Sequence, residues 1–192
     1  PRVDIVALAF SQHRADADEH NPYRQAERLL AASGARHVIL RPNWFSDNFV
    51  GFWAEGIAHG TLALPAGDGR ISFIDSRDIA AAAAAALQTA RFDGEAIELT
   101  GPQALDLHEA AERLSTVSGR PVRYQPVDAD AYVSALVDAG VPDDYARMLA
   151  GLFDLVREGI TGDVCDGVER LTGRRARPLE LTLRDRGLAD AH

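Results

Sequence analysis

The sequence has 192 residues, of which 46% are hydrophobic and 26% charged, values typical of one ordinary soluble globular domain. The formal net charge of −9 argues against nucleic acid or an anionic membrane as a partner. All 20 basic residues are arginine, which excludes a Schiff-base lysine, a Walker A lysine and a Tyr-Lys proton relay within this chain.

The first part of the sequence alternates predicted strands with predicted helices. Apolar runs and three-to-four spacings predict strands at residues 3–9 and 37–40 and helices at 23–32 and 44–59, with a polar loop at 11–21. Pro22 suits a first helical turn, and Ser33-Gly34 ends the helix that follows it. Arg41-Pro42 is expected to end the second strand.

The remaining residues continue the alternation but become more helical. They predict short strands at 62–64 and 71–74 around a turn at 67–69, a helix at 77–90, a strand at 96–99, a helix at 106–117 and a strand at 122–127. Residues 128–158 predict two helices separated by Gly140-Val141-Pro142, residues 159–177 a loop, and 179–181 a short final element. This order predicts an α/β fold with a mostly parallel sheet and a smaller, more helical lobe.

Four segments carry a family resemblance. Residues 31–45, AASGARHVILRPNWF, resemble the NmrA-like group of atypical short-chain dehydrogenases/reductases, whose members include NAD(P)H:quinone-reductase-like proteins. Further segments match in the same order: ISFIDSRDIA at 71–80, AIELTGP at 96–102, and the helix and strand within 107–124. The resemblance covers the C-terminal two-thirds of such a protein. It implies a Rossmann-like first portion over residues 1–100 and a substrate-side lobe over 101–192, interleaved without a clean boundary.

The sequence also departs from this family. It opens at what resembles the family's fourth strand, and no G-x-G-x-x-G spacing occurs near its start, so we expect the first strands and the phosphate-binding loop to be absent from this chain. Pro1 in place of methionine indicates a processed, trimmed or truncated polypeptide. The resemblance implies NAD or NADP as cofactor, but without the loop we expect this chain not to hold it tightly.

The candidate catalytic residues lie near the end of the first strand. Ser11 and Tyr23 resemble the serine and tyrosine of short-chain dehydrogenases, but Glu27 stands where the lysine would be, and a carboxylate disfavours the phenolate. His13 is an alternative proton donor. With His20 and the loop carboxylates it also suggests a metal site, although a solvated loop is favoured and we predict no metal.

The end of the second strand supplies the predicted binding residues. The resemblance implies that Arg41, Pro42 and Asn43 contact the cofactor and that Trp44, Phe45, Asn48 and Phe49 wall the substrate pocket. Together with Phe52 and Trp53, these rings suit a flat, apolar or quinone-like substrate. The competing interpretation is that about half of the aromatic side chains belong to the core.

Two further polar segments, the start of the alanine-rich helix and an arginine cluster near the C-terminus, are each interpreted as mainly structural. Asp78 or Ser76 is predicted to cap the alanine-rich helix that follows Asp75. The cluster formed by Arg174, Arg175 and Arg177 suits either a 2′-phosphate or acidic partner or, as favoured here, surface salt bridges.

These features support three functional hypotheses. The first is the substrate-side portion of an NAD(P)-dependent oxidoreductase acting on a carbonyl, quinone or similar small apolar acceptor. The second is a non-catalytic dinucleotide sensor or regulatory binding protein, and the third is a cofactor-free, repurposed member of the fold.

The cysteine content, the hydropathy and the first strand of the sequence give expectations about cellular location and oligomeric state. A single cysteine, Cys165, and the lack of an apolar run of about 18 residues favour the cytoplasm and no membrane partner. We expect a homodimer, or a complex with a missing N-terminal half, through Val3, Ile5 and Ala7 of the first strand.

Overall fold

The computed structural model describes residues 5–8 and 22–188. The chain divides into two compact units, each assembled from three stretches of sequence. The first unit comprises Pro1–Ser46, Ser72–Gln103 and Asp163–Leu179, and the second comprises Asp47–Ile71, Ala104–Gly162 and Glu180–His192.

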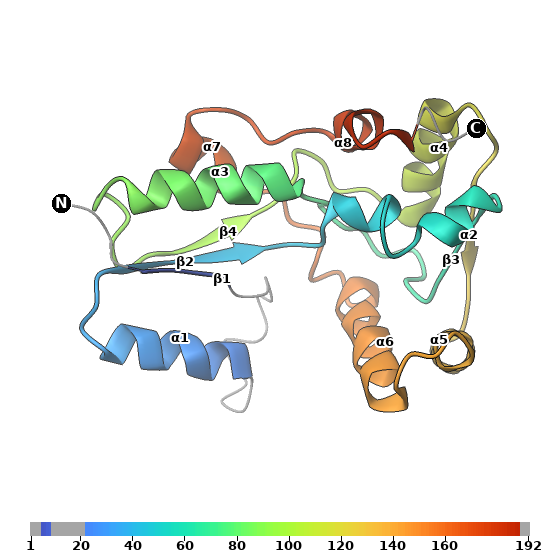
Figure 1. Ribbon diagram of the computed structural model, residues 1–192, viewed down its shortest axis with the longest axis horizontal. Helices are drawn as coiled ribbons and strands as arrows, with labels where there is room; N and C mark the ends of the chain where they lie inside the picture. The colour runs from blue at the N-terminus through green and yellow to red at the C-terminus, as the bar shows by residue number, and fades with distance from the viewer. Residues whose placement is uncertain (1–4, 9–21, 189–192) are drawn as a thin grey trace. The chain divides into compact units, whose positions relative to one another are not determined.

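A parallel sheet forms the centre of the first unit. Its described strands are β1 (Ile5–Leu8), β2 (His37–Pro42) and β4 (Ala96–Leu99), with β2 in the middle. Helix α1 (Pro22–Ala32) lies on one face of the sheet, and α3 (Ser76–Leu87) and α7 (Gly167–Thr172) lie on the other (Figure 1). The predicted α/β class and parallel sheet are confirmed.

The core of the first unit lies between the sheet and α3. Val38 and Leu40 of β2 are completely buried, as are Ala82 and Ala86 of α3. The small alanine side chains leave room for the helix backbone to approach the sheet and α7 closely. The alanine run is therefore a packing face as well as a strong helix former.

Strand β2 is longer than predicted, because it continues through Arg41 and Pro42. Pro42 lies opposite Leu99 of β4, and the next residue, Asn43, donates its backbone N–H to the Leu99 carbonyl at 2.9 Å. Proline removes only one donor from the ladder, so pairing resumes directly after it.

The start of α3 corrects a predicted cap. Asp75, and not Asp78 or Ser76, is the N-cap, and its carboxylate accepts the Arg77 backbone N–H at 2.7 Å. Asp78 lies within the first helical turn and has a distant partner, Arg177.

Helix α7 lies inside residues 159–177, which were wrongly predicted to be a loop throughout. A Cβ at Gly167 would stand 2.0 Å from the Glu98 carbonyl oxygen, so glycine lets this helix begin directly against β4. This close approach is a tertiary constraint that the local sequence does not signal.

The second unit contains a two-stranded parallel sheet, β3 (Thr61–Leu64) and β5 (Arg123–Pro126). Its helical elements are η2 (Ser46–Phe49), a 3₁₀ turn, and α2 (Ala54–Ala58), α4 (Leu107–Ser118), α5 (Ala129–Asp138), α6 (Asp143–Arg157) and α8 (Leu179–Asp185). Helix α4 contacts β5, and α5 contacts α6. The two predicted helices on either side of residues 140–142 are confirmed.

Residues 44–59 do not form the single helix that was predicted. The chain turns between η2 and α2, where the Trp53 N–H donates to the Asn48 carbonyl at 2.8 Å. A Cβ at Gly56 would lie 2.8 Å from the Thr61 carbonyl oxygen, so this glycine lets α2 pack directly on β3. The predicted strand at 71–74 is also wrong, because Ile71 and Ile74 make only isolated bridges, to Leu105 and Phe45.

None of the described helices is long and apolar enough to cross a membrane.

Candidate functional site

Asn43 fixes the carboxyl end of β2. Its side chain is 3% exposed. The Nδ2 group donates to the Ser72 hydroxyl at 2.7 Å, and Oδ1 accepts the Trp44 backbone N–H at 2.8 Å. Asn43 therefore ties the end of the central strand to the segment that leads into α3, and it shapes this edge of the sheet from within.

Arg41 joins the sheet to α1 through a buried ion cluster. Its guanidinium donates to both carboxylate oxygens of Glu27, at 3.0 and 2.7 Å, and to Glu98 on β4 at 3.3 Å. Arg24 donates to the same Glu27 carboxylate at 2.6 and 2.7 Å. Two guanidiniums and two carboxylates thus neutralise one another, and the Arg41 side chain is part of this cluster.

The two arginines set the protonation of Glu27. Burial by itself raises the pKa of the Glu27 carboxyl, but the hydrogen bonds and positive charges of Arg41 and Arg24 outweigh this effect and hold the pKa below its usual value. Glu27 is therefore a carboxylate with a structural role.

The predicted catalytic residues are only partly described. Tyr23 lies in the first turn of α1 and is 49% exposed, while Glu27, four residues later, is bound by arginines. Ser11 and His13 lie outside the described residues. Their joint action with Tyr23 stays a prediction.

The predicted pocket wall is split between core and surface. Trp44 is buried in the first unit and Phe49 is completely buried in the second, where its ring meets Trp53 edge-on at 5.1 Å. Asn48 is half-buried. Phe45, two residues after Asn43, is 37% exposed, so part of its ring faces solvent.

The end of β4 contributes residues that the sequence reasoning did not select. The Thr100 hydroxyl accepts the Cys165 backbone N–H at 3.0 Å, and the Cys165 thiol donates to the Glu98 carbonyl at 3.0 Å. A Cβ at Gly101 would lie 1.9 Å from the Phe73 carbonyl oxygen. The LTGP motif could have pointed to these residues. It was noted only for its resemblance to the NmrA-like family, and the close packing of its glycine was not predicted.

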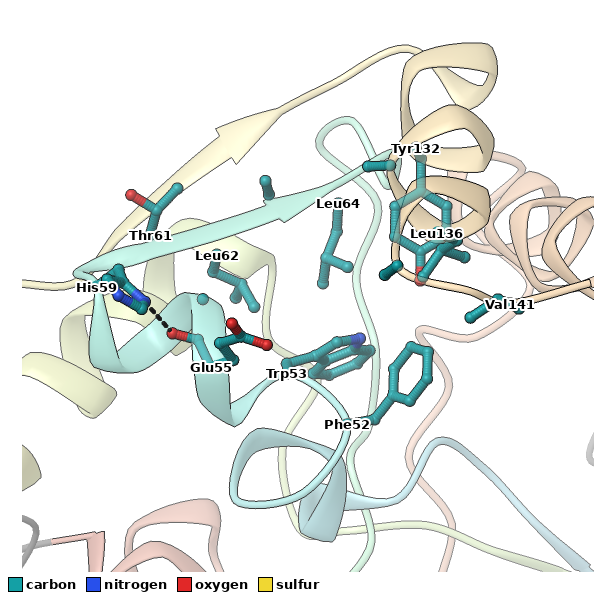
Figure 2. A pocket seen from close by; sticks show the side chains of 14 residues that line it. Phe52, Trp53, Glu55, His59, Thr61, Leu62, Leu64, Tyr132, Leu136 and Val141 are labelled. Carbon is teal, nitrogen blue, oxygen red and sulfur yellow. Dashed lines mark hydrogen bonds between the residues drawn. The ribbon is translucent and has the colours of Figure 1, made fainter.

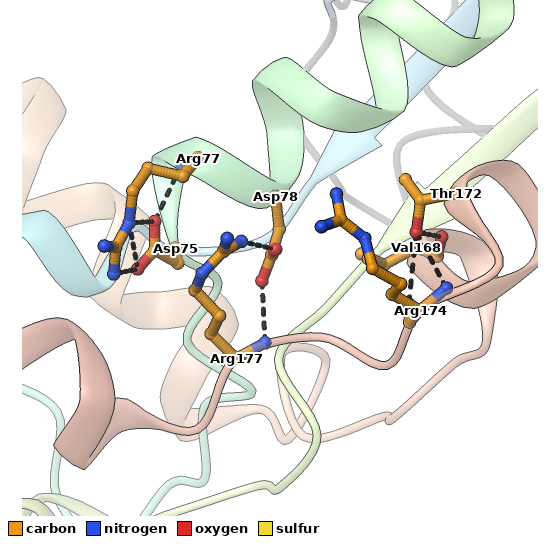
Figure 3. Close-up of polar contacts among 7 residues, drawn as sticks. All are labelled: Asp75, Arg77, Asp78, Val168, Thr172, Arg174 and Arg177. Carbon is orange, nitrogen blue, oxygen red and sulfur yellow. Dashed lines mark hydrogen bonds and ion pairs between the residues drawn. The ribbon is translucent and has the colours of Figure 1, made fainter.

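The arginines after α7 act at least partly as salt-bridge residues. Arg177 donates its backbone N–H to Asp78 at 2.7 Å, and its guanidinium pairs with the same carboxylate (Figure 3). Arg77 binds Asp75 beside it through both Nε and Nη2. Arg177 therefore forms a salt bridge, as the favoured interpretation of the arginine cluster expects.

A separate cavity of about 540 Å³ lies in the second unit, lined by residues of α2, β3 and α5 and their flanking turns (Figure 2). Its labelled lining residues are Phe52, Trp53, Glu55, His59, Thr61, Leu62, Leu64, Tyr132, Leu136 and Val141. The sequence singled out Phe52 and Trp53 as aromatic surface but gave no sign that residues 132–141 lie opposite them.

Across residues 5–8 and 22–188, no group of three or more His, Cys, Asp or Glu side chains is placed to hold a metal ion.

Comparisons with known proteins agree on one family. The model of the NmrA-like family matches residues 12–182. The chain is 36% identical over 152 residues to an NAD(P)H azoreductase of Xenophilus azovorans, covering 79% of this chain and 53% of that protein. It is 37% identical over 147 residues to quinone oxidoreductase 2 of Escherichia coli (strain K12), covering 72% of this chain and 50% of that protein.

A solved structure extends the likeness. The NADPH-dependent quinone oxidoreductase from Escherichia coli in complex with NADPH matches with a TM-score of 0.82 and 29% identity, over 94% of this chain and 64% of that one. The chain thus spans about half the length of these two curated relatives.

Proposed function

The chain belongs to the NmrA-like family, and from that premise we propose that it contributes the region facing the nicotinamide and the acceptor in an NAD(P)-dependent oxidoreductase. The substrate we propose is a carbonyl, a quinone or a similar small apolar acceptor. The observation that carries this proposal is the likeness, over 94% of the chain, to an NADPH-bound quinone oxidoreductase.

The proposed cofactor edge is the carboxyl end of β2, since ligands of open parallel sheets bind beyond the carboxyl ends of the strands. The guanidinium of Arg41 is bound by Glu27 and Glu98. This charge-neutral edge therefore fits the nicotinamide end of the dinucleotide better than its diphosphate. The backbone around Pro42 and the buried Asn43 would define the surface against which the ring lies.

A bound reduced nicotinamide would supply the hydride for the acceptor. The chain's own contribution is orientation: the Asn43–Ser72 hydrogen bond holds the strand end in one position. The half-exposed ring of Phe45 offers a flat apolar surface to an aromatic acceptor. The exposed Tyr23 hydroxyl is the group we propose as hydrogen-bond donor to an acceptor oxygen.

Mapping of the nicotinamide site tests this assignment. Nicotinamide mononucleotide, titrated at millimolar concentration into the isotope-labelled chain, should shift the backbone amides of residues 41, 43–45 and 98–101. Adenosine monophosphate, the other half of the dinucleotide, is the matched control and should leave these amides in place. Shifts confined to other residues, or equal effects of both nucleotides at this edge, would overturn the assignment.

A non-catalytic dinucleotide sensor is the second candidate, and one observation favours it. Glu27 stands where a short-chain dehydrogenase would carry the relay lysine, and it is bound by Arg24 and Arg41. Such a protein would bind the dinucleotide without turning over a quinone.

We also propose the cytoplasm as the place of action, because Cys165 is a free thiol within the described residues.

A further inference from the structure

The cavity of the second unit has the size and walls of a small-molecule site. Its volume of about 540 Å³ falls within the range of roughly 300–1,000 Å³ found for ligand pockets. Three rings contribute to its walls: Phe52, which is 53% exposed, Trp53 and Tyr132. Leu62, Leu64 and Leu136 add aliphatic surface.

One charged group breaks this apolar lining. Figure 2 shows the Glu55 side chain directed towards the same space as the Trp53 ring. Within the part of the chain that the structure describes, no hydrogen bond or ion pair involves the Glu55 carboxylate. The carbonyl of Glu55, and not its carboxylate, lies 2.8 Å from Nδ1 of His59.

Of the other polar groups of the lining, Tyr132 and Thr61 are uncharged at neutral pH, and His59 is the remaining ionisable side chain. Burial raises the pKa of Tyr132 to about 12, against a smaller opposing effect of the neighbouring Trp53 indole, so the phenol stays neutral. Thr61 carries no charge, and Glu55 is the only carboxylate among the lining residues.

We propose that this cavity binds a small aromatic cation, with its ring against Phe52 and Trp53 and its protonated amine paired with Glu55. The aromatic faces themselves favour a cation through their quadrupoles. A carboxylate ligand would be repelled by the charge of Glu55, and a purely apolar ligand would gain nothing from that exposed carboxylate. Every lining residue belongs to the second unit, so the proposal does not depend on the proposed cofactor edge.

A matched pair of probes tests the charge requirement. 2-Naphthylmethylamine is protonated at pH 7, and 2-naphthylmethanol has nearly the same shape without the charge. We expect both to shift the Trp53 indole resonance of the full chain, with the amine binding about threefold to fivefold more tightly, as befits an ion pair at a partly exposed site.

Three variants complete the experiment. Glu55→Gln should abolish the preference for the amine, whereas the control Glu112→Gln, at an exposed position of α4 in the same unit, should retain it. Phe52→Ala should weaken both probes about fivefold through the loss of ring contact, while circular dichroism confirms an unchanged fold. Absence of binding at millimolar concentration, equal affinity of the two probes for the native chain, or a preference that survives Glu55→Gln would each overturn the proposal. Neither probe is a quinone or a dinucleotide, so these outcomes leave the proposed reductase function untouched.

Discussion

The side-chain amide of Asn43 and the hydroxyl of Ser72 form a 2.7 Å hydrogen bond in the buried interior of the first unit. The bond joins the carboxyl end of the central strand to the segment that leads into α3, and it is made by residues 29 positions apart. The edge that we assign to the nicotinamide is therefore held from inside the protein.

Asn43→Ala should lower the free energy of unfolding by about 2 kcal/mol, because it leaves the buried Ser72 hydroxyl and Trp44 N–H without this partner. Urea denaturation of Asn43→Ala, Ser72→Ala and the double variant measures the coupling. We expect a coupling energy of about 1 kcal/mol. Strictly additive effects would mean that the bond contributes nothing.

Substitutions at Asn43 should affect ligand affinity or turnover more than a substitution at Tyr23. In a form of the protein that binds dinucleotide, Asn43→Ala and Trp44→Ala should each change affinity or turnover more than Tyr23→Phe, because they disturb the strand end. The lack of a lysine four residues after Tyr23 argues against Tyr23 as the proton donor. If Tyr23→Phe alone abolished turnover while Asn43→Ala behaved like the native protein, that argument would be wrong.

Glu27→Gln should destabilise the protein by about 3 kcal/mol at pH 7, because it leaves Arg24 and Arg41 with a neutral partner in a buried cluster. The pKa of Glu27 is lowered on folding, so its stabilisation is fully present above the unfolded value of 4.5 and is lost as the pH falls through the lower, folded value. The difference between Glu27→Gln and the native chain in denaturant titrations should therefore shrink in acid. A constant difference from neutral pH to pH values below the folded pKa would contradict this account, and Glu112→Gln serves as the exposed control.

Gly101→Ala should cost about 2 kcal/mol, because the added Cβ would stand 1.9 Å from the Phe73 carbonyl oxygen and the backbone must move. Gly151→Ala in α6 is the matched control: nothing lies within 4 Å of its Cβ, and alanine should stabilise that helix by about 0.5–1 kcal/mol. Thermal unfolding of both variants measures the contrast. Equal effects of the two substitutions would show that Gly101 is not tightly enclosed.

The 192-residue chain by itself should show no binding of NADH or NADPH at micromolar concentration. The proposed edge presents Arg41 already bound to carboxylates, and no glycine-rich turn of the dinucleotide type occurs near the start of the sequence. Calorimetry that gave a low-micromolar dissociation constant would contradict this expectation.

Several of these features follow from local sequence and others do not. Helix α4 was predictable because its signals are local: Asp106 and Glu109 form a capping box at its start, and Gly119, with a φ of 67°, ends it. The Asp75 cap is local, but Ser76 and Asp78 are good N-cap residue types as well, and what removes Asp78 from that role is its pairing with Arg177, which lies 99 residues away. A partner so distant leaves no local pattern.

The second unit was partly mispredicted, and contacts between residues far apart in the sequence explain why its cavity was not predicted. The predicted helix over 44–59 is interrupted between η2 and α2, where the Trp53 N–H donates to the Asn48 carbonyl, and the spacing of apolar residues does not reveal this turn. The cavity combines Phe52 and Trp53 with Tyr132 and Leu136, and only the folded chain brings these segments together. The parallel sheet was predictable because a buried strand such as β2 is apolar on both faces.

Strand β1 provides a prediction about assembly. Among the described strands it pairs only with β2 and so lies at the edge of their three-stranded sheet. We expect a homodimer, or a complex with a further N-terminal segment, that covers this edge. Sedimentation should show it, and a well-folded monomer at tens of micromolar with fast amide exchange in β1 would contradict it.

We propose that this chain supplies the nicotinamide and acceptor face of an NAD(P)-dependent reductase. The deciding measurement uses a chimera in which the part of Escherichia coli quinone oxidoreductase 2 that this chain does not match is joined to this chain, and it follows NADPH oxidation with menadione. We predict NADPH binding together with reduction of the quinone, and a loss of turnover of about tenfold in Phe45→Ala if its ring holds the acceptor. A folded chimera that binds NADPH and leaves menadione unreduced would contradict the claim and support the dinucleotide sensor instead.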